Sequence, residues 1–220
     1  MLKQNLAQIF SLTDKGNNLG EPITVVGASK TMSVDVINEA IKLGLKVVAE
    51  NKVQEFNQKH EFIVGADQHF IGHLQTNKVK YLVGKVKLIH SVDSVHLAET
   101  INARAKQIGT IQDVLLEVNV ANEQTKSGFN YDEIEKVAYE LRSLDNLQVK
   151  GLMAMLPNTD DEQLLSLLCQ KMRTLFDKLK ASGFAFEYLS VGMSQDYKIA
   201  IQNGSNMIRL GRTIFGERNY

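Results

Sequence analysis

The sequence predicts an α/β protein, a (β/α)8 TIM barrel with an extra N-terminal helix. Three observations favour this fold. Short apolar runs alternate with longer amphipathic stretches, eight such runs occur, and a chain of 220 residues lies within the size range of compact barrels. Strict alternation of strands and helices indicates parallel strands joined by crossovers. An open, doubly wound sheet is the alternative, but such a sheet usually needs only about five or six strands.

The eight strand candidates are short apolar runs, most of them rich in β-branched residues. In chain order they are Ile23–Ala28, Lys46–Ala49, Gln68–Gly72, Lys87–His90, Asp113–Val120, Gln148–Met153, Glu187–Val191 and Asn206–Gly211. A helical pattern follows each of the first seven, so each run is expected to form one strand of the barrel.

Helical spacing of apolar residues marks the stretches between these strands. The clearest stripes are Val34, Ile37, Ile41 and Leu45; Leu97, Ile101 and Ala105; Ile134, Val137, Ala138 and Leu141; and Leu164, Leu168, Met172, Leu175 and Leu179. Ser33, Ser94 and the pair Asp160-Asp161 precede three of these stripes as N-cap candidates, and Gly183 ends the last one. Shorter helices are expected at Val53–Phe62, Asn77–Val83 and Gln195–Asn203, and the extra helix at Leu2–Lys15.

The composition excludes several classes of protein. Lysine plus arginine and aspartate plus glutamate each number 25, and this zero net charge argues against a nucleic-acid partner, whose phosphates attract a basic surplus. Apolar residues make up 44% of the chain, which excludes a disordered protein. Only two prolines and no Gly/Ser-rich run occur, so residues 1–220 are expected to form a single domain.

Cysteine usage and hydropathy indicate where the protein works. Cys169 is the single cysteine, so an intrachain disulfide is impossible, and its place in an amphipathic stripe predicts core packing. No stretch approaches the roughly 18 apolar residues of a membrane span, and the N-terminus lacks the apolar core of a signal peptide. We therefore expect a cytoplasmic protein that binds no membrane.

The residues at the predicted strand ends include several with ligand-binding chemistry. Active sites of such barrels lie at the C-terminal ends of the strands. In chain order the candidates are Lys30, Asn51, His73, Met153, Ser190, Ser194, Arg209, Gly211 and Arg212. Because loops are polar in any protein, polarity alone does not indicate a ligand site, but the kinds of residue at these positions do. These include one lysine, one arginine within an apolar strand, and a Gly/Ser cluster after the seventh and eighth strands.

Lys30 shares a predicted strand face with Val26 and Ala28. A partly desolvated amine loses its proton more readily, and a neutral amine can form a Schiff base with an aldehyde. A lysine at a strand end can equally well reach solvent, since lysine is usually exposed.

The loops after the seventh and eighth strands predict a phosphate site. In such barrels these loops and a nearby helix N-terminus frequently hold phosphate. Ser190 ends the seventh strand, Ser194 precedes the helix at Gln195–Asn203, and Gly211-Arg212 follows the eighth. Taken singly, Ser194 is an ordinary N-cap and Gly211 an ordinary turn glycine.

Arg209 lies inside an apolar strand, where its charge needs a partner, either a carboxylate of a neighbouring strand or a ligand atom. An aldehyde-reactive lysine, a phosphate cup and a ring-facing arginine together are what pyridoxal 5′-phosphate (PLP) requires. The sequence contains no motif for a metal site, a serine nucleophile or a nucleotide-binding loop. The five histidines lack metal-ligand spacing, and no GxSxG, GxxxxGK[ST] or GxGxxG motif occurs.

At these residues the sequence resembles the YggS/PROSC family of pyridoxal phosphate homeostasis proteins. The matching segments span nearly the whole chain: VVGASKTMSVDVINEAIKLG, AENKVQEF, HFIGHLQTNKVKYLV, IHSVDS, LLEVNVANEQTKSGF, GLMAMLP and LSVGMSQDYKIAIQNGSNMIRLGRTIFGERNY. Two departures are visible. Ala49 replaces the glycine of the usual GEN, and Gln68 stands where an aromatic residue is more common.

The resemblance implies a barrel like the N-terminal domain of alanine racemase, with Lys30 holding PLP as an internal aldimine. It places Asn51 and His73 near the cofactor ring, with Met153 at the same mouth. It places Ser190, Ser194, Gly211 and Arg212 near the phosphate. It also implies that Arg209 faces the pyridine nitrogen and keeps it unprotonated, which weakens the ring as an electron sink.

Three function classes remain. The protein could buffer or deliver PLP to apo PLP-dependent enzymes, act as an amino-acid racemase, or be a scaffold that merely retains the pocket. A racemase of this fold resembles a longer chain with a second domain, whereas only Thr213–Tyr220 follows the last predicted strand here. We therefore expect intracellular PLP homeostasis without dedicated turnover, in a monomer. A weak, one-base racemase activity is the alternative.

Overall fold

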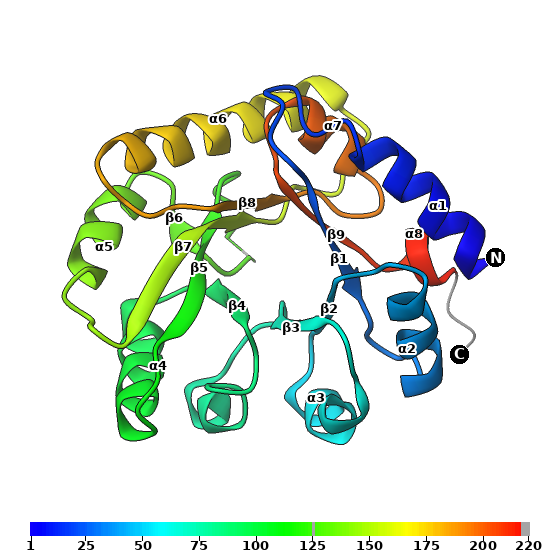
Figure 1. Cartoon of the computed structure of the whole chain (residues 1–220). Helices are drawn as coiled ribbons and strands as arrows, with labels where there is room; N and C mark the ends of the chain where they lie inside the picture. Colours follow the sequence, from blue (N-terminus) through cyan, green and yellow to red (C-terminus); the bar gives the residue numbers. More distant parts are fainter. Residues whose placement is uncertain (125, 217–220) are drawn as a thin grey trace.

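The computed structural model describes residues 1–124 and 126–216. Its centre is a ring of eight parallel strands (Figure 1). These are β1 (Thr24–Ala28), β2 (Val47–Glu50), β3 (Asp67–Phe70), β4 (Leu88–Val92), β5 (Gln112–Asn119), β7 (Leu147–Ala154), β8 (Tyr188–Val191) and β9 (Met207–Leu210). The ring closes because β1 pairs with β9 and β4 pairs with β5. The predicted TIM barrel is therefore confirmed, and the open-sheet alternative is wrong.

Helices surround the barrel (Figure 1). They are α1 (Leu2–Thr13), α2 (Val34–Lys42), α3 (Val53–Lys59), α4 (Val95–Gln107), α5 (Ile134–Leu141), α6 (Glu162–Ala181), α7 (Tyr197–Gln202) and α8 (Arg212–Phe215). Two 3-10 helices, η1 (His60–Phe62) and η2 (Thr76–Tyr81), complete the set. None of these helices is both long and apolar enough to cross a membrane.

Two short elements were not predicted. The two-residue strand β6 (Phe129–Asn130) pairs with β5 outside the ring, and α8 follows the last barrel strand. Neither is long enough to establish an apolar period in the sequence. The helix predicted at Val53–Phe62 divides into α3 and η1, and the one predicted at Asn77–Val83 is the 3-10 helix η2.

Strand alternation divides the core into an inner part and an outer part. Val26, Val47, Ala49, Leu88, Leu115, Met153 and Met207 form one buried cluster from six barrel strands, and this cluster fills the interior. Residues of opposite parity, such as Val25 and Ile208, pack against the helices outside. Arg209 is in register with Val26, so its side chain belongs to the interior.

In the longest helix, α6, one residue of the predicted apolar stripe does not face the core. Leu164 is exposed and Leu165 is buried, whereas Leu168, Met172, Leu175 and Leu179 face the core as expected. Asp161 is the N-cap, and its Oδ1 accepts a hydrogen bond from the Leu164 N–H at 3.0 Å. Leu164 therefore lies in the first turn, on the solvent side of the stripe. Cys169 is buried in this helix, as predicted, and burial raises the pKa of its thiol to about 12.

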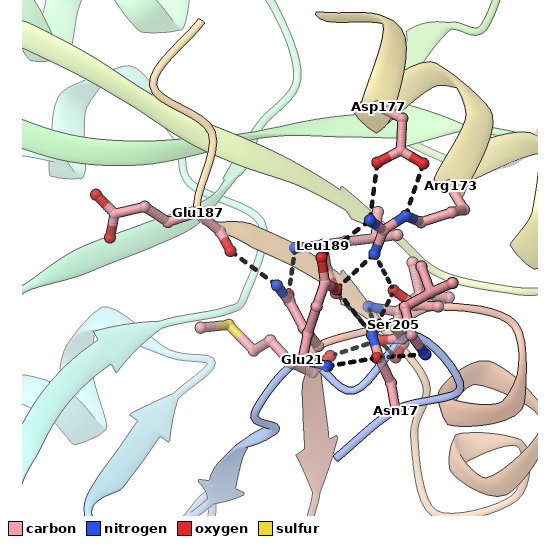
Figure 2. A network of polar contacts seen from close by, with 12 residues as sticks. Asn17, Glu21, Arg173, Asp177, Glu187, Leu189 and Ser205 are labelled. Carbon is pink, nitrogen blue, oxygen red and sulfur yellow. Dashed lines mark hydrogen bonds and ion pairs between the residues drawn. The ribbon is translucent and has the colours of Figure 1, made fainter. Parts of the chain in front are cut away.

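A polar network ties the loop before β1 to α6 (Figure 2). Arg173 lies between two carboxylates, with Nη2 donating to Glu21 Oε1 at 2.9 Å and Nε donating to Asp177 Oδ2 at 2.9 Å. Asn17 Nδ2 also donates to Glu21, at 2.8 Å. Because the Arg173–Glu21 bond is partly buried and joins segments far apart in sequence, it fixes the entry of the chain into the barrel.

We predict that Gly151→Ala in β7 lowers the free energy of unfolding by at least about 2 kcal/mol, because the backbone must shift. Gly151 has φ +152°, and a Cβ there would lie 1.9 Å from the carbonyl oxygen of Tyr188. Gly109→Ala is the matched control, since its φ is +68° but no heavy atom lies within 4 Å of the added Cβ. Urea unfolding should show the larger loss for Gly151, and equal losses would contradict the argument.

Candidate functional site

The predicted site residues meet at one mouth of the barrel. Because all ring strands are parallel, their C-terminal ends lie at the same edge. Lys30, Asn51 and His73 follow β1, β2 and β3, whereas Met153, Ser190 and Arg209 lie on β7, β8 and β9, and Ser194, Gly211 and Arg212 follow β8 and β9. The residues next to any single strand end do not include all of these side chains. The closed ring brings them together.

Arg209 is the centre of the buried part of this site. Its side chain lies inside the barrel, where Nη1 donates to both Ser190 O and Ser190 Oγ at 2.7 Å, and Nη2 donates to Ala154 O at 3.0 Å. Burial lowers the pKa of Arg209 to about 10, so the guanidinium is still cationic at neutral pH. Of the two partners that the sequence allowed, a carboxylate in a direct ion pair is not found among the described residues, although Asp196 and Glu117 act on Arg209 electrostatically.

Two histidines extend this network through the barrel. The distance from Ser190 Oγ to His90 Nδ1 is 3.3 Å, and that from His90 Nε2 to His69 Nδ1 is 3.0 Å. Both histidines are buried, and burial lowers the pKa of His69 to about 3 and that of His90 well below its usual value. Both rings are therefore neutral, and each has one donor nitrogen and one acceptor nitrogen.

The arginine sets the direction of this chain of hydrogen bonds. A guanidinium only donates, so Ser190 Oγ accepts from Arg209 and has its own proton to give to His90 Nδ1. His90 then carries its proton on Nε2 and donates to His69 Nδ1, which leaves the proton of His69 on Nε2. One buried cation thereby fixes both tautomers.

Glu117 is a site residue that the sequence analysis missed. It is buried on β5, in register with Met153, which is itself in register with Ser190. Burial raises its pKa to about 6, and Asp93 adds to the shift, while Arg209 and His73 oppose it. The alternation of Leu115 with Glu117, like that of Leu88 with His90, was a usable signal. A polar side chain of inner parity within an apolar strand must face the barrel interior.

Asn51 and His73 line the side of the mouth formed by β1 to β3. Asn51 Oδ1 is buried and has no hydrogen-bond partner among the described residues. His73 is mostly exposed, and its Nδ1 lies 3.2 Å from Asp93 Oδ2. This side therefore offers an acceptor and a ring nitrogen to a ligand.

The loops after β8 and β9 differ in detail from the prediction. Ser194 is not the N-cap of α7, because the helix begins at Tyr197 and Asp196 occupies the cap position. Ser194 Oγ instead accepts a hydrogen bond from the Thr213 N–H at 3.5 Å, which links the two loops. Gly211 precedes α8, and a Cβ added there would make only ordinary contacts with Ala28, at 3.6 and 3.7 Å. Arg212 is exposed at the start of α8.

Two observations test whether these residues fit PLP. Asn51 Oδ1 is buried without a hydrogen-bond partner among the described residues, and Arg209 is a buried cation whose hydrogen bonds go to neutral acceptors rather than to a carboxylate. A half-buried lysine lies at the same mouth. The donor set therefore fits an aldehyde ligand that carries a ring nitrogen and a polar ring substituent. No group of three metal-ligating side chains was found among the described residues.

A cavity opens at the opposite, N-terminal mouth of the barrel. Its volume is about 720 Å³, and it is lined by residues at the strand starts such as Thr24, Asp67 and Asp113, together with Phe10 and Thr13 of α1. It contains none of the predicted site residues. Its walls lack a lysine beside an orphaned polar atom, so we place the chemistry at the C-terminal mouth despite the volume of this cavity.

Known proteins resemble the chain over nearly its whole length. The model of the alanine racemase N-terminal domain matches residues 2–219. A pyridoxal phosphate homeostasis protein of Aquifex aeolicus is 44% identical over 199 residues, which cover 89% of this chain and 87% of that protein. The chain belongs to the family of pyridoxal phosphate homeostasis proteins. Its relatives in this family are named for homeostasis rather than as enzymes.

Solved structures agree with this membership. PipY of Synechococcus elongatus PCC7942, solved with PLP bound, is 28% identical, with a TM-score of 0.86 and coverage of 98% of this chain and 100% of PipY. Alanine racemase of Clostridium difficile 630 shares the fold at a TM-score of 0.81 and 20% identity. The family member described here spans only 57% of that racemase chain.

The buried histidines predict a loss of stability in acid. The unfolded chain takes up protons at His69 and His90 below pH 6.5, whereas the folded chain takes them up only at much lower pH, about 3 for His69. The free energy of unfolding should therefore fall as the pH is lowered from about 6.5 towards 3. His69→Gln should flatten this slope in urea titrations between pH 6.5 and 4.5, and an unchanged slope would contradict the assignment.

Proposed function

We propose that this protein binds PLP at the C-terminal mouth of the barrel, with Lys30 Nζ holding the cofactor covalently, and serves PLP homeostasis. The observation that carries the proposal is the convergence of Lys30, the orphaned Asn51 Oδ1 and the buried Arg209 at one mouth. The names of the relatives and the PLP-bound PipY support it. When bound, PLP supplies an electron-withdrawing ring and an aldehyde that reacts with amines.

Different residues at the mouth are assigned to the ring and to the phosphate of the cofactor. Arg209 can only donate, so a ring nitrogen that faces it stays unprotonated. Asn51 and His73 contact the ring from the β1–β3 side, and Met153 packs below it as part of the inner core. We assign Ser194, Gly211 and Arg212 to the phosphate. Gly211 admits the close approach of an anion, and Ser194 already links the two phosphate loops. Ser190 acts through Arg209, to which it is bonded.

We also propose that the bound cofactor is buffered and delivered to apo PLP-dependent enzymes in the cytoplasm. The single cysteine, buried and with a raised thiol pKa, suits a reducing compartment. The organisation of residues 1–220 as a single domain stays a prediction, as does the monomeric state, which light scattering would test.

Lys30→Ala should abolish the absorption band of lysine-bound PLP after reconstitution and lower the affinity for PLP by at least about tenfold. The loss of the amine assigned to the cofactor is the physical reason. Lys52→Ala, an exposed lysine before α3, is the matched control and should keep the band. A band of equal strength in Lys30→Ala would overturn the proposal.

The racemase alternative makes a different prediction. A two-base racemase would exchange the Cα proton of an amino acid with solvent at a sustained rate that depends on Lys30. We expect at most slow exchange in deuterated buffer, and transfer of PLP to an apo-enzyme at a faster rate. Rapid, Lys30-dependent racemisation would favour the enzyme instead.

A further inference from the structure

The turn that carries Lys30 contains a strained residue. Residues Ser29 to Met32 form a four-residue turn, which closes through a hydrogen bond from the Met32 N–H to the Ser29 carbonyl at 3.0 Å. Thr31 is the third residue of this turn and has φ +67°. Turns with a positive φ at this position favour glycine, and a β-branched residue is costly there. Something outside the turn must therefore hold it in place.

Two carboxylates hold the turn, one on each side of Lys30. Glu55 of α3 accepts a hydrogen bond from the Thr31 N–H at 2.8 Å. Glu50, at the end of β2, has its Oε1 3.1 Å from Ser29 Oγ. The residues before and after Lys30 are thus each bonded to a different acidic side chain.

Lys59 joins the two carboxylates into one cluster. Its Nζ lies 2.9 Å from Glu50 Oε1 and 2.8 Å from Glu55 Oε2. The side chains of Glu50, Glu55 and Lys59 are 3%, 19% and 13% exposed, so the ion pairs are shielded from water and hold their geometry better than surface pairs. The cluster spans β2 and α3, and both of its ends reach the Lys30 turn.

Lys59 and Glu55 are charged at neutral pH, whereas burial raises the pKa of Glu50 above its usual value. Burial alone would lower the pKa of Lys59, but its hydrogen bonds to Glu55 and Glu50 raise that pKa above its usual value. Burial alone would raise the pKa of Glu55, but the bonds from Lys59 and from the Thr31 N–H hold it below its usual value. The bond to Thr31 is therefore a charge-assisted one.

We propose that Glu55 and Lys59 are positioning residues, which hold the strained Ser29–Met32 turn and thereby preorganise Lys30 for the cofactor. The inference rests on the proposed binding of PLP at Lys30. The ion pair between Glu55 and Lys59 then has a role beyond packing, because it keeps the backbone of Thr31 in its strained conformation.

The test is a double-mutant cycle between Glu55→Gln and Thr31→Gly, read in two ways. In the protein without cofactor, Glu55→Gln should increase the hydrogen exchange rate of the Thr31 amide about tenfold. In a PLP titration followed by absorbance, it should weaken binding about tenfold, as expected for the loss of one charge-assisted hydrogen bond. Glu61→Gln, an exposed glutamate of η1, is the control and should change neither readout.

Thr31→Gly supplies the decisive arm, because glycine adopts the positive φ without strain. In the Thr31→Gly background, Glu55→Gln should weaken PLP binding less than about threefold. Because the strained residue is gone, this pair of variants also keeps the test valid if Glu55→Gln alone folds poorly.

Three outcomes would overturn the inference. PLP affinity unchanged in Glu55→Gln would do so alone, and so would an equal loss of affinity in the Thr31→Gly background. A wild-type protein that binds no PLP would overturn the proposed function together with this inference, and it is recognised by the absence of the absorption band before any variant is compared.

Discussion

The buried guanidinium of Arg209 determines how the polar groups inside this barrel are arranged. A cation that is removed from water must find acceptors, and here they come from Ser190 of β8 and Ala154 of β7. These contacts require β7, β8 and β9 to lie side by side, which the closed parallel sheet provides. The same cation orders the protons of His90 and His69. Asp196 and Glu117 act on this cation electrostatically, but no ion pair within 4.0 Å joins it to a carboxylate among the described residues.

The two sides of the mouth supply different chemistry. The β1–β3 side contributes turn residues, with Lys30 in a strained turn held from behind by Glu55 and Glu50. The β7–β9 side contributes charge and backbone, with Arg209 deep in the barrel and the loops after β8 and β9 at the mouth. A ligand bound between them can therefore be attached covalently on one side and held electrostatically on the other, which is a suitable arrangement for a cofactor that must be both retained and released.

Residues whose charge conflicts with apolar surroundings could be predicted from the sequence. Contacts that depend on strand register or on backbone conformation could not. Lys30 and Arg209 stood out because a charge beside or within an apolar run needs an explanation. Ser194 was expected directly before a helix at Gln195–Asn203, but that helix begins at Tyr197 and Asp196 takes the cap position. The pairing of His69 with His90 depends on strand register, and the φ of Thr31 depends on a carboxylate of α3. Neither leaves a local signature in the sequence.

The most direct test is a crystal structure of the protein reconstituted with PLP. The account predicts continuous density between Lys30 Nζ and the cofactor, with the ring nitrogen within hydrogen-bond distance of Arg209 and the phosphate beside Ser194 and Gly211. Cofactor bound at the N-terminal mouth, or attached to a different lysine, would contradict it.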